Sequence, residues 1–566
     1  MNSDNNAVEE ALSLIESVGL PHPQGPLLAS FVTEAVSPSQ AARYVSDRLF
    51  AGESSSIVSD WTYLIECITR NGRLPPQLDA QTQSTITRRD GVRCCVTGKK
   101  GTFWDPLLVL PILPIPSGWD TEKVQIFNML GAFFGPQYRD WWLSYVRNPN
   151  LMPPHYNHWL VRQSTAKALT LGLIKLDRLQ PSIVEYEVSH VLIGPEEPLP
   201  VDGTYPLLGD HSRSGIEKID PRFVGTHSRL CRSIRFLELT KRLAADNLPQ
   251  VSGSSIWCYI WQSPVQSQMQ SRKRFSLTTC ATGTFLAVWL MFPRKFRISS
   301  YNILRRVGEY IYGKSNGYST VQRLPFGLYL KFQGQNGMFR NELNALRIVR
   351  KYTSIPTPDP LDIVTESGHA NDPFPSPKTY LLITRLPGLP LSRCQDVLSD
   401  RDCEQVSNQL GNYLAQLRDI PKVINTDMAI CNTLGEACQD PRILGGLPVG
   451  PFKDEAAFSQ TLRYSDDSAR RGHKIVLTHA DLNPRNILVD QVTRSDGSRG
   501  WVVTGIVDWE TSGYYPDYWD YTKAMFEGFR WSRRYNDMIR KVFREFGDYS
   551  KEYDVEKRSW ELGDGV

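Results

Sequence analysis

Three short apolar runs near the C-terminus, with polar side chains set between them, constrain the fold more than any other feature of the sequence. The runs Ile475–Leu477, Ile487–Val489 and Val502–Val507 have the length and composition of short strands. Asp496-Gly497-Ser498 has the composition of a turn between the second run and the third. Polar groups at strand ends lie on loops that a rigid backbone can aim. The pattern therefore predicts a C-terminal domain whose loops carry aligned polar side chains.

Two carboxylates and one amide occupy these loops in a fixed order. Asp481 precedes Asn486, and Asp508 follows the third apolar run. Phosphoryl transfer from ATP needs Mg²⁺, which prefers hard oxygen ligands, and a carboxylate that orients the attacking hydroxyl. We therefore expect Asp481 to act as the base, and Asn486 and Asp508 to bind Mg²⁺. The alternative is a set of polar turn residues between core strands, and the ordered set that includes His479 favours the catalytic interpretation.

The same segment resembles a known family. The residues that carry the resemblance are His479, Ala480, Asp481, Asn486, Asp508, Trp509 and Glu510. They resemble the His-Gly-Asp, Asn and Asp-Trp/Phe-Asp/Glu motifs of the aminoglycoside phosphotransferase and choline kinase superfamily, most closely its fungal members. The resemblance implies a catalytic role for Asp481, Mg²⁺ binding by Asn486 and Asp508, and a bracing role for His479. Ala480 departs from the family's usual Gly, and we expect this smallest of changes to be tolerated.

A second half of a kinase-like site can be found upstream. Residues 327–332 alternate as a half-buried strand that carries Lys331, the candidate for gripping the ATP phosphates. Residues 339–350 have helical periodicity and carry Glu342, which can reach back to hold the lysine. The alternative is an exposed lysine and an ordinary surface glutamate. The downstream carboxylates favour the ion pair.

The predicted nucleotide contacts outside this pair rest on weaker signals. Residues 312–321 offer Gly313, Ser315, Gly317 and Ser319, small residues that let backbone N–H groups approach phosphate oxygens. A plain turn explains the same segment, which matches neither a protein-kinase glycine loop nor a P-loop. The apolar run 380–384 fits the hinge between two lobes. By resemblance only, the adenine would contact the backbone near Thr384 and Leu386.

The acceptor is less constrained. Residues 509–520 are dense in aromatic and acidic side chains, which would favour a cationic, hydroxyl-bearing small molecule through cation–π and ion-pair contacts. The alternative is a structural turn whose aromatic side chains pack into the helical lobe. We favour that alternative for Tyr518, Trp519 and Asp520, and the acceptor stays open.

Composition places the whole chain among ordinary globular proteins. Its 566 residues are 41% apolar and 22% charged, with a net charge of +4 that gives no global electrostatic case for nucleic acid. Ten cysteines are scattered without a Cys-x-x-Cys pair, so no zinc knuckle is indicated. The first twenty residues are acidic and lack the pattern of a signal peptide. We therefore expect a reducing, cytoplasmic location.

The N-terminal half carries a second resemblance. Residues 88–98 resemble the opening of fungal HNH-type endonuclease domains, in which the next strand bears a catalytic histidine. Here that strand is expected at 107–116 and contains no histidine, while Asn150, His155 and His158 lie where the later part of the motif could fall. Without the first histidine, water has no base and hydrolysis should be lost. The interpretations left open are a decayed HNH-like scaffold and an unrelated α+β domain, with an active nuclease disfavoured.

Two further segments yield structural predictions. Asp220-Pro221 has the composition of a turn, and residues 229–245 have the periodicity of an amphipathic helix. Residues 275–293 contain no charge and are flanked by basic residues, but they fall just short of the length that spans a bilayer. We favour a connecting helix that is buried or lies on a membrane surface over a true span.

Together these observations predict an α+β chain whose bilobal, protein-kinase-like C-terminal domain follows a mixed α/β, HNH-like N-terminal domain. The predicted boundaries are 1–250, a connecting helix within 251–300, and 301–566. The predicted function is ATP- and Mg²⁺-dependent transfer of a phosphate to a hydroxyl of a small molecule. The alternatives are a nucleotide-binding pseudokinase with a regulatory role and a protein that acts on nucleic acid through its N-terminal region.

Overall fold

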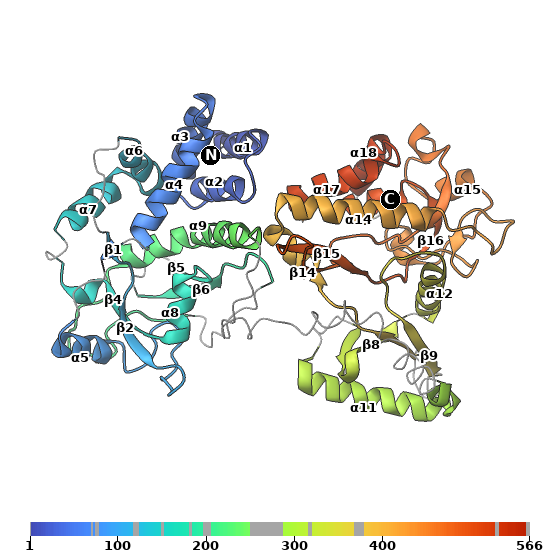
Figure 1. The fold of residues 1–566 in the computed structure, drawn as a ribbon, viewed down its shortest axis with the longest axis horizontal. Helices are drawn as coiled ribbons and strands as arrows, with labels where there is room; N and C mark the ends of the chain where they lie inside the picture. The colour runs from blue at the N-terminus through green and yellow to red at the C-terminus, as the bar shows by residue number, and fades with distance from the viewer. Residues whose placement is uncertain are drawn as a thin grey trace. The chain divides into compact units, whose positions relative to one another are not determined.

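The computed structural model describes most of the chain and divides it into two compact units, residues 1–247 and 248–566. The described residues are 2–69, 72–73, 78–116, 124–148, 152–179, 184–195, 205–248, 287–314, 320–334, 336–366, 378–526 and 531–561. Figure 1 shows both units, which mix helices with small sheets. The domain boundaries predicted above stay a prediction.

Helices dominate the first unit. They are α1 (Asn2–Ser17), α2 (Gln24–Thr33), α3 (Pro38–Phe50), α4 (Ser54–Thr69), α5 (Ala80–Arg89), α6 (Val124–Phe134), α7 (Pro136–Arg147), α8 (Gln163–Thr170) and α9 (Pro221–Asp246). The core between α2, α4 and α6 is aromatic: the ring centroids of Phe31 and Trp61 lie 4.8 Å apart, and those of Trp61 and Phe133 lie 4.7 Å apart. All three side chains are fully buried, which fixes this bundle.

Helix α9 begins earlier than the sequence pattern indicated. Asp220 accepts a hydrogen bond from the backbone N–H of Arg222, and Pro221 occupies the first helical position. The prediction of a turn at Asp220-Pro221 was wrong because an acidic cap followed by proline also starts a helix. The helical prediction for 229–245 falls within α9.

The strands of the first unit form antiparallel pairs. They are β1 (Gly72–Arg73) with β3 (Ile115–Pro116), β2 (Leu107–Pro111) with β4 (His158–Arg162), and β5 (Ile174–Arg178) with β6 (Tyr186–His190). The single strand expected at 107–116 is thus two strands in different sheets. Proline at 111 and 114 interrupts the run, because proline cannot donate to a strand ladder.

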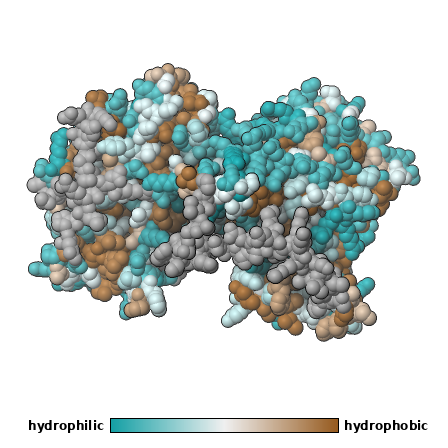
Figure 2. Space-filling view, in the orientation of Figure 1, coloured by the Kyte–Doolittle hydropathy of each residue, from teal (hydrophilic) through white to brown (hydrophobic). Residues whose placement is uncertain are grey.

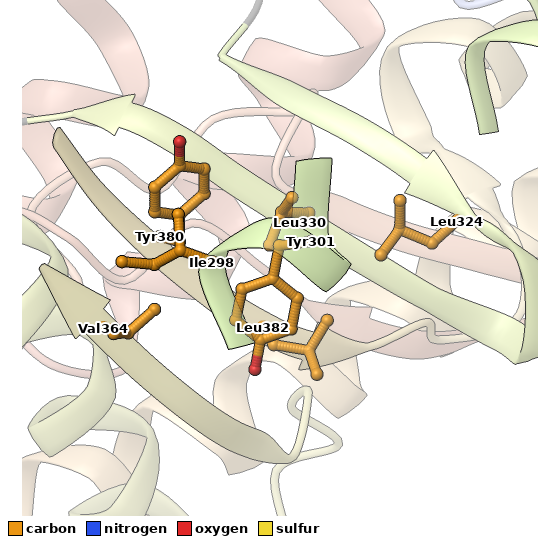
Figure 3. Close-up of a cluster of buried hydrophobic side chains, with 7 residues drawn as sticks. All are labelled: Ile298, Tyr301, Leu324, Leu330, Val364, Tyr380 and Leu382. Carbon is orange, nitrogen blue, oxygen red and sulfur yellow. The ribbon is translucent and has the colours of Figure 1, made fainter. Parts of the chain in front are cut away.

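The second unit opens with a small lobe. Its elements are α11 (Arg294–Tyr312), β7 (Val321–Leu324), β8 (Leu328–Gly334), α12 (Asn336–Tyr352), β9 (Pro360–Glu366) and β10 (Lys378–Thr384). Within the described residues the strands form an antiparallel sheet in the order β7-β8-β10-β9. One apolar cluster on this sheet is closed by α11, whose Ile298 and Tyr301 pack with Leu330 and Leu382 (Figure 3).

The larger lobe carries two further sheets and most of the remaining helices. The strands are β11 (Leu389–Pro390), β12 (Cys431–Asn432), β13 (Ile475–Thr478), β14 (Ile487–Thr493), β15 (Arg499–Ile506) and β16 (Gly513–Pro516). The helices are α13 (Leu391–Cys394), α14 (Asp400–Arg418), α15 (Glu455–Ser459), α16 (Trp519–Phe526), α17 (Arg533–Arg544) and α18 (Ser550–Glu561). The sheet orders are β11-β14-β15 and β12-β16-β13, so the three predicted C-terminal strands lie in two sheets.

The apolar connecting segment is only partly described. Residues 275–286 of the predicted stretch lie outside the described residues, and 287–291 are helical. Proline at 293 precedes α11, which runs on through residue 300. Of the helices that the structure describes, none combines the length and apolarity that crossing a bilayer requires.

Candidate functional site

Lys331 lies at the centre of a cluster of carboxylates contributed by three parts of the second unit. Its Nζ is 2.7 Å from Glu342 Oε2, 2.5 Å from Asp508 Oδ1 and 3.6 Å from Glu510 Oε2. The lysine is on β8, Glu342 is on α12, and the other two acids follow β15. The predicted ion pair between the strand lysine and the helix glutamate is therefore present in the geometry.

Local sequence explains why these side chains meet. Lys331 pairs across the sheet with Leu381 of β10 and points away from the face that carries Leu330. Helix α12 presents Glu342 on the same stripe as the buried Leu346 and Val349, so the carboxylate enters the interior with the apolar face. Both charged groups are nearly inaccessible, with exposures of 5% for Lys331 and 1% for Glu342.

The cluster holds more negative than positive charge. Burial alone would lower the pKa of Lys331, but the carboxylates around it outweigh burial and raise that pKa. Burial raises the pKa of Glu342 even beside the lysine. Burial, together with the neighbouring carboxylates, also raises the pKa of Glu510 to about 7. Three acids against one ammonium thus leave a site that would gain from a further cation.

Asp481 lies in the loop after β13, where three donors fix its carboxylate. Its Oδ2 accepts a hydrogen bond from Asn486 Nδ2 at 2.8 Å, and its Oδ1 accepts one from Asn483 Nδ2 at 3.0 Å. Lys523 Nζ of α16 is 3.3 Å from the same Oδ1. The side chain keeps 23% of its accessible surface, so the carboxylate is held in place yet open to solvent.

The side chain of His479 connects the two polar loops. Its Nδ1 accepts a hydrogen bond from the backbone N–H of Asp481 at 3.2 Å, which leaves Nε2–H to donate to the carbonyl of Val507 at 3.0 Å. The ring is buried and contacts Trp509, with centroids 4.5 Å apart. Both ring nitrogens thus bind protein groups in the two loops, and the catalytic and bracing roles predicted for His479 stay predictions.

The buried Asp520, which the sequence did not single out as functional, holds the backbone of the same loop. The carboxylate of Asp520 accepts hydrogen bonds from the backbone N–H of His479 at 3.2 Å and of Ala480 at 2.7 Å. Ala480 has φ of 63°, in the left-handed region where glycine is the least strained residue. The left-handed backbone explains why the family usually has Gly at this position, and the expectation that Ala480 is tolerated there stays a prediction.

The backbone brings the predicted metal ligands together. The N–H of Val507 donates to the carbonyl of Asn486 at 2.9 Å, and Asp508 follows directly, with φ of 70°. Asn486 is in turn hydrogen-bonded to Asp481. The three predicted residues, Asp481, Asn486 and Asp508, therefore lie in adjoining loops, and Asp508 is also part of the Lys331 cluster. Their roles stay predictions.

The remaining predicted nucleotide contacts divide into two groups. Ser315, Gly317 and Ser319 lie outside the described residues, while Gly313, φ of 82°, ends α11 and its carbonyl accepts a hydrogen bond from the Gln322 side chain. Thr384 and Leu386 lie where β10 leaves the small lobe. The backbone N–H of Thr384 donates to Asp359 at 3.1 Å, so that donor is already used.

Glu510 and Lys523, like Asn483 and Asp520, were not predicted from the sequence as residues of this site. The position of Glu510, two residues after Asp508 on a turn, is a signal from which it could have been predicted. Lys523 had no local signal, because its α16 is brought to Asp481 only by the folding of the domain. A contact between residues this far apart in the chain leaves no local pattern in the sequence.

The donor set fits a magnesium ion. Glu342, Asp508 and Glu510 each offer a carboxylate oxygen, and these oxygens lie within 4.8 Å of one another. Hard oxygen donors at this density, with unbalanced negative charge, suit Mg²⁺. Asn486 adds an amide whose Nδ2 is committed to Asp481, which is consistent with a carbonyl oxygen left for a cation.

The histidines of the first unit have structural partners. His155 Nε2 pairs with Glu217, and His158 Nδ1 lies 2.6 Å from the carbonyl of Pro154. Asn150 lies outside the described residues. The buried Arg89 and Asp90 pin β4, since Arg89 donates to the carbonyl of His158 and Asp90 accepts from Leu160 N–H. Within the described part of residues 1–247, no group of side chains suited to a metal occurs.

Comparison with known proteins gives a partial match. An apo thermostable mutant of aminoglycoside phosphotransferase APH(4)-Ia is 13% identical, with a TM-score of 0.29; the match covers 44% of this chain and 86% of that one. The GDP and kanamycin complex of APH(2")-IIia is 16% identical, with a TM-score of 0.31, over 46% of this chain and 91% of that one. Similarity at this level says nothing about the substrate of this chain. No curated protein matches it.

The sequence match is confined to the second unit. Residues 335–553 match the profile of the Phosphotransferase enzyme family, and they include Glu342, Asp481, Asn486 and Asp508 but not Lys331. The N-terminal HNH resemblance and the fungal affinity find no counterpart in these comparisons. The chain therefore contains, over residues 335–553, a domain of the Phosphotransferase enzyme family.

Proposed function

We propose that the second unit is an ATP- and Mg²⁺-dependent phosphotransferase that transfers the γ-phosphate to a hydroxyl of a small molecule. The observation that carries this proposal is the cluster in which Lys331 joins Glu342 of α12 to Asp508 of the loop after β15. Asp481 lies in the adjoining loop with an accessible carboxylate. A cation site beside a fixed carboxylate base is the minimum that phosphoryl transfer requires.

Lys331 is the residue for the phosphates of the nucleotide. Its ammonium stays protonated because three carboxylates surround it, and Glu342 holds it from the side of α12. Asp508 Oδ1, at 2.5 Å, is the partner that a phosphate oxygen can replace, because its side chain is 38% exposed whereas Glu342 is buried. Glu342 thus keeps Lys331 in position, while a phosphate oxygen can replace the exposed Asp508.

Asp481 is the residue for the acceptor. Asn483, Asn486 and Lys523 fix both of its oxygens, so the carboxylate has one orientation from which to accept the hydrogen bond of an incoming hydroxyl. It would take that proton as the oxygen attacks phosphorus. His479 and Asp520 hold the backbone of this loop.

Asn486 and Asp508 are the residues for the metal, with Glu510 beside them. Bound Mg²⁺ would neutralise the negative charge of the phosphates. The surplus of carboxylates over ammonium groups around Lys331 supports this assignment, and burial together with the neighbouring carboxylates raises the pKa of Glu510. Removal of divalent ions by a chelator should abolish transfer and leave the fold intact.

The acceptor class is defined only as a hydroxyl-bearing small molecule. The aromatic residues of the segment expected to contact a cation include Trp509, Tyr515 and Trp519, and these three are fully buried. Tyr515 and Trp519 stack on each other with centroids 5.4 Å apart. The segment 509–520 therefore supports the structural alternative rather than a cation-binding surface.

For the first unit we infer a scaffold with HNH-like arrangement and no nuclease activity. Strands β2 and β4 pair, α8 follows, and the histidines hydrogen-bond to protein groups. A nuclease assay with Mg²⁺, Mn²⁺ or Zn²⁺ on the full chain should yield no cleavage. Cleavage that disappears in His158→Ala would overturn this inference.

One experiment separates an enzyme from a nucleotide-binding pseudoenzyme. The full chain is incubated with Mg·ATP labelled at the γ-phosphate and a library of hydroxyl compounds, beside Asp481→Asn and the surface control Asp466→Asn. We expect transfer by the parent chain and the control, and its loss in Asp481→Asn with an unchanged Mg·ATP thermal shift. A thermal shift without transfer in the parent chain would favour the pseudoenzyme.

A further inference from the structure

Helix α11 has an apolar face that is exposed to solvent. We use the term exposed stripe for Phe292, Phe296, Ile303, Val307 and Tyr310, whose exposed fractions are 41%, 50%, 61%, 39% and 92%. The four positions on α11 recur at intervals of three, four or seven residues, so they lie on one side of the helix. Phe292 precedes the helix, and its ring centroid lies 4.9 Å from that of Phe296. Figure 2 shows hydrophobic residues at the place that α11 occupies in Figure 1.

The opposite side of α11 is already committed to the core of the small lobe. Ile298 and Tyr301 pack against the sheet (Figure 3). Tyr301 Oη and Arg297 both bind the buried carboxylate of Asp362 on β9, the latter at 2.5 Å. A side chain on Gly308 would meet the carbonyl oxygen of Arg323 at 2.2 Å, so the helix lies directly against β7. The helix therefore cannot roll to bury the exposed stripe.

Positive charge flanks the exposed stripe. Arg294, Lys295, Arg306 and Lys314 are exposed, and none of them pairs with a carboxylate among the described residues. The acid of α11, Glu309, pairs with Arg305. At 100° per residue, Lys295 and Arg306 project beside the stripe, from where their long side chains can extend past it.

From this arrangement we propose that α11 is a docking surface for an anionic lipid bilayer. The exposed stripe would enter the boundary between headgroups and acyl chains, with Phe292, Phe296 and Tyr310 as aromatic anchors. Lys295 and Arg306 would meet lipid phosphates and carboxylates. Contact of this kind lies along the plane of the membrane and needs no spanning helix.

Charge decides against a second copy of the chain as the occupant. Two α11 helices packed stripe to stripe would bring unpaired cations of one helix beside those of the other, with no acid to separate them. Like charges held this close are destabilising. An anionic surface supplies the opposite charge along the whole helix.

The test is flotation of the full chain with vesicles of phosphatidylcholine alone or of phosphatidylcholine with phosphatidylserine. We expect binding to the anionic vesicles only, weakening as ionic strength rises. The variant Phe296→Gln/Ile303→Gln/Tyr310→Gln should lower partitioning by at least about a hundredfold. Lys295→Gln/Arg306→Gln should lower it by roughly thirtyfold.

A matched control lies on the other unit. Phe103→Gln/Trp104→Gln removes two aromatic side chains that are 88% and 87% exposed, and it should leave vesicle binding unchanged. Should the triple variant fail to fold by circular dichroism, the double variant of exposed cations decides by itself. Absence of binding by the parent chain, or equal binding by the parent and the α11 variants, overturns the proposal. So does a parent dimer by sedimentation that the triple variant converts to monomer without vesicle binding.

Discussion

Two buried ion networks lie in the second unit, and they differ in balance. Around Arg442 and Arg470 the charges cancel: Arg442 is 2.9 Å from Asp440 and 3.4 Å from Glu556, which is 3.5 Å from Arg470. All four side chains are at most 1% exposed. The cluster around Lys331 has one ammonium for three carboxylates. A balanced network is complete by itself and serves the fold, whereas an unbalanced one is completed by a ligand.

The largest effect should come from removing one charge of the unbalanced cluster. We expect Asp508→Asn to lower Mg·ATP-dependent phosphate transfer by about a thousandfold or more, because it weakens the proposed metal ligand, where transition-state charge would be stabilised. The free energy of unfolding should change by less than about 1 kcal/mol, since Glu342 and Glu510 still pair with the lysine. Transfer assays and urea unfolding on the same preparation measure the two. If Asp508→Asn destabilised the fold and left phosphate transfer unaltered, the Lys331 cluster would serve the fold rather than a ligand.

Disruption of the balanced network around Arg442 and Arg470 should instead lower the stability of the fold. Arg442→Met leaves Asp440 without its arginine in a fully buried site, and we expect a loss of about 3–5 kcal/mol in the free energy of unfolding. Thermal and urea unfolding measure this loss. Arg401→Met, which removes an exposed ion pair with Asp496 at 3.2 Å, serves as the control and should cost less than about 1 kcal/mol.

A third network sharpens the comparison because its cation can titrate. His473 lies between Glu455, at 2.5 Å, and Glu552, at 3.2 Å. Burial alone would lower the pKa of His473, but its hydrogen bonds to the two carboxylates outweigh burial and raise that pKa to about 9. The folded pKa exceeds the ordinary value of 6.5, so this stabilisation is complete below about pH 6.5 and is lost as pH rises through about 9.

The size of this loss in the free energy of unfolding follows from the raised pKa of His473. A shift from 6.5 to about 9 corresponds to about 3 kcal/mol between the two ends of that range. Urea unfolding at stepwise pH values should show the decline, and His473→Gln should remove it. A parent chain whose stability is flat from pH 6 to 10 would mean that folding does not raise the pKa of His473.

The smallest expected effect concerns the turn beneath the base. Ala480→Gly should raise the free energy of unfolding by at most about 1 kcal/mol, because release of left-handed strain exceeds the added entropy of the unfolded chain only slightly. Differential scanning calorimetry of the two chains resolves this change. A lower melting temperature for the glycine variant would show that the turn is not strained.

The sequence predicted the parts of the site that depend on local pattern. Alternation along 327–332 and helical spacing along 339–350 placed Lys331 and Glu342 on facing elements, and the structure has these as β8 and α12. The composition of Asp496-Gly497-Ser498 predicted the turn between β14 and β15, which a hydrogen bond from Arg494 N–H to the Ser498 carbonyl closes. Such features are set by residues near one another in the chain.

Features that depend on distant contacts could not be predicted. Lys523 reaches Asp481 through the packing of α16, and nothing in its own segment signals that partner. Helix α11 carries apolar residues on two sides. Long-range contacts, such as that of Tyr301 with Asp362, decide which side is buried. Asp220-Pro221 was mistaken for a turn because the same dipeptide can end one segment or begin a helix.

The backbone of Val507 is shared by both loops of the site. Its N–H is hydrogen-bonded to the carbonyl of Asn486, and its carbonyl accepts from His479, whose other ring nitrogen holds Asp481. A displacement of this one peptide unit is therefore transmitted both to Asn486 and, through His479, to the loop that carries Asp481. A displacement of Asp508 would therefore also shift the loop that carries Asp481, so the proposed metal ligand and the proposed base would move together.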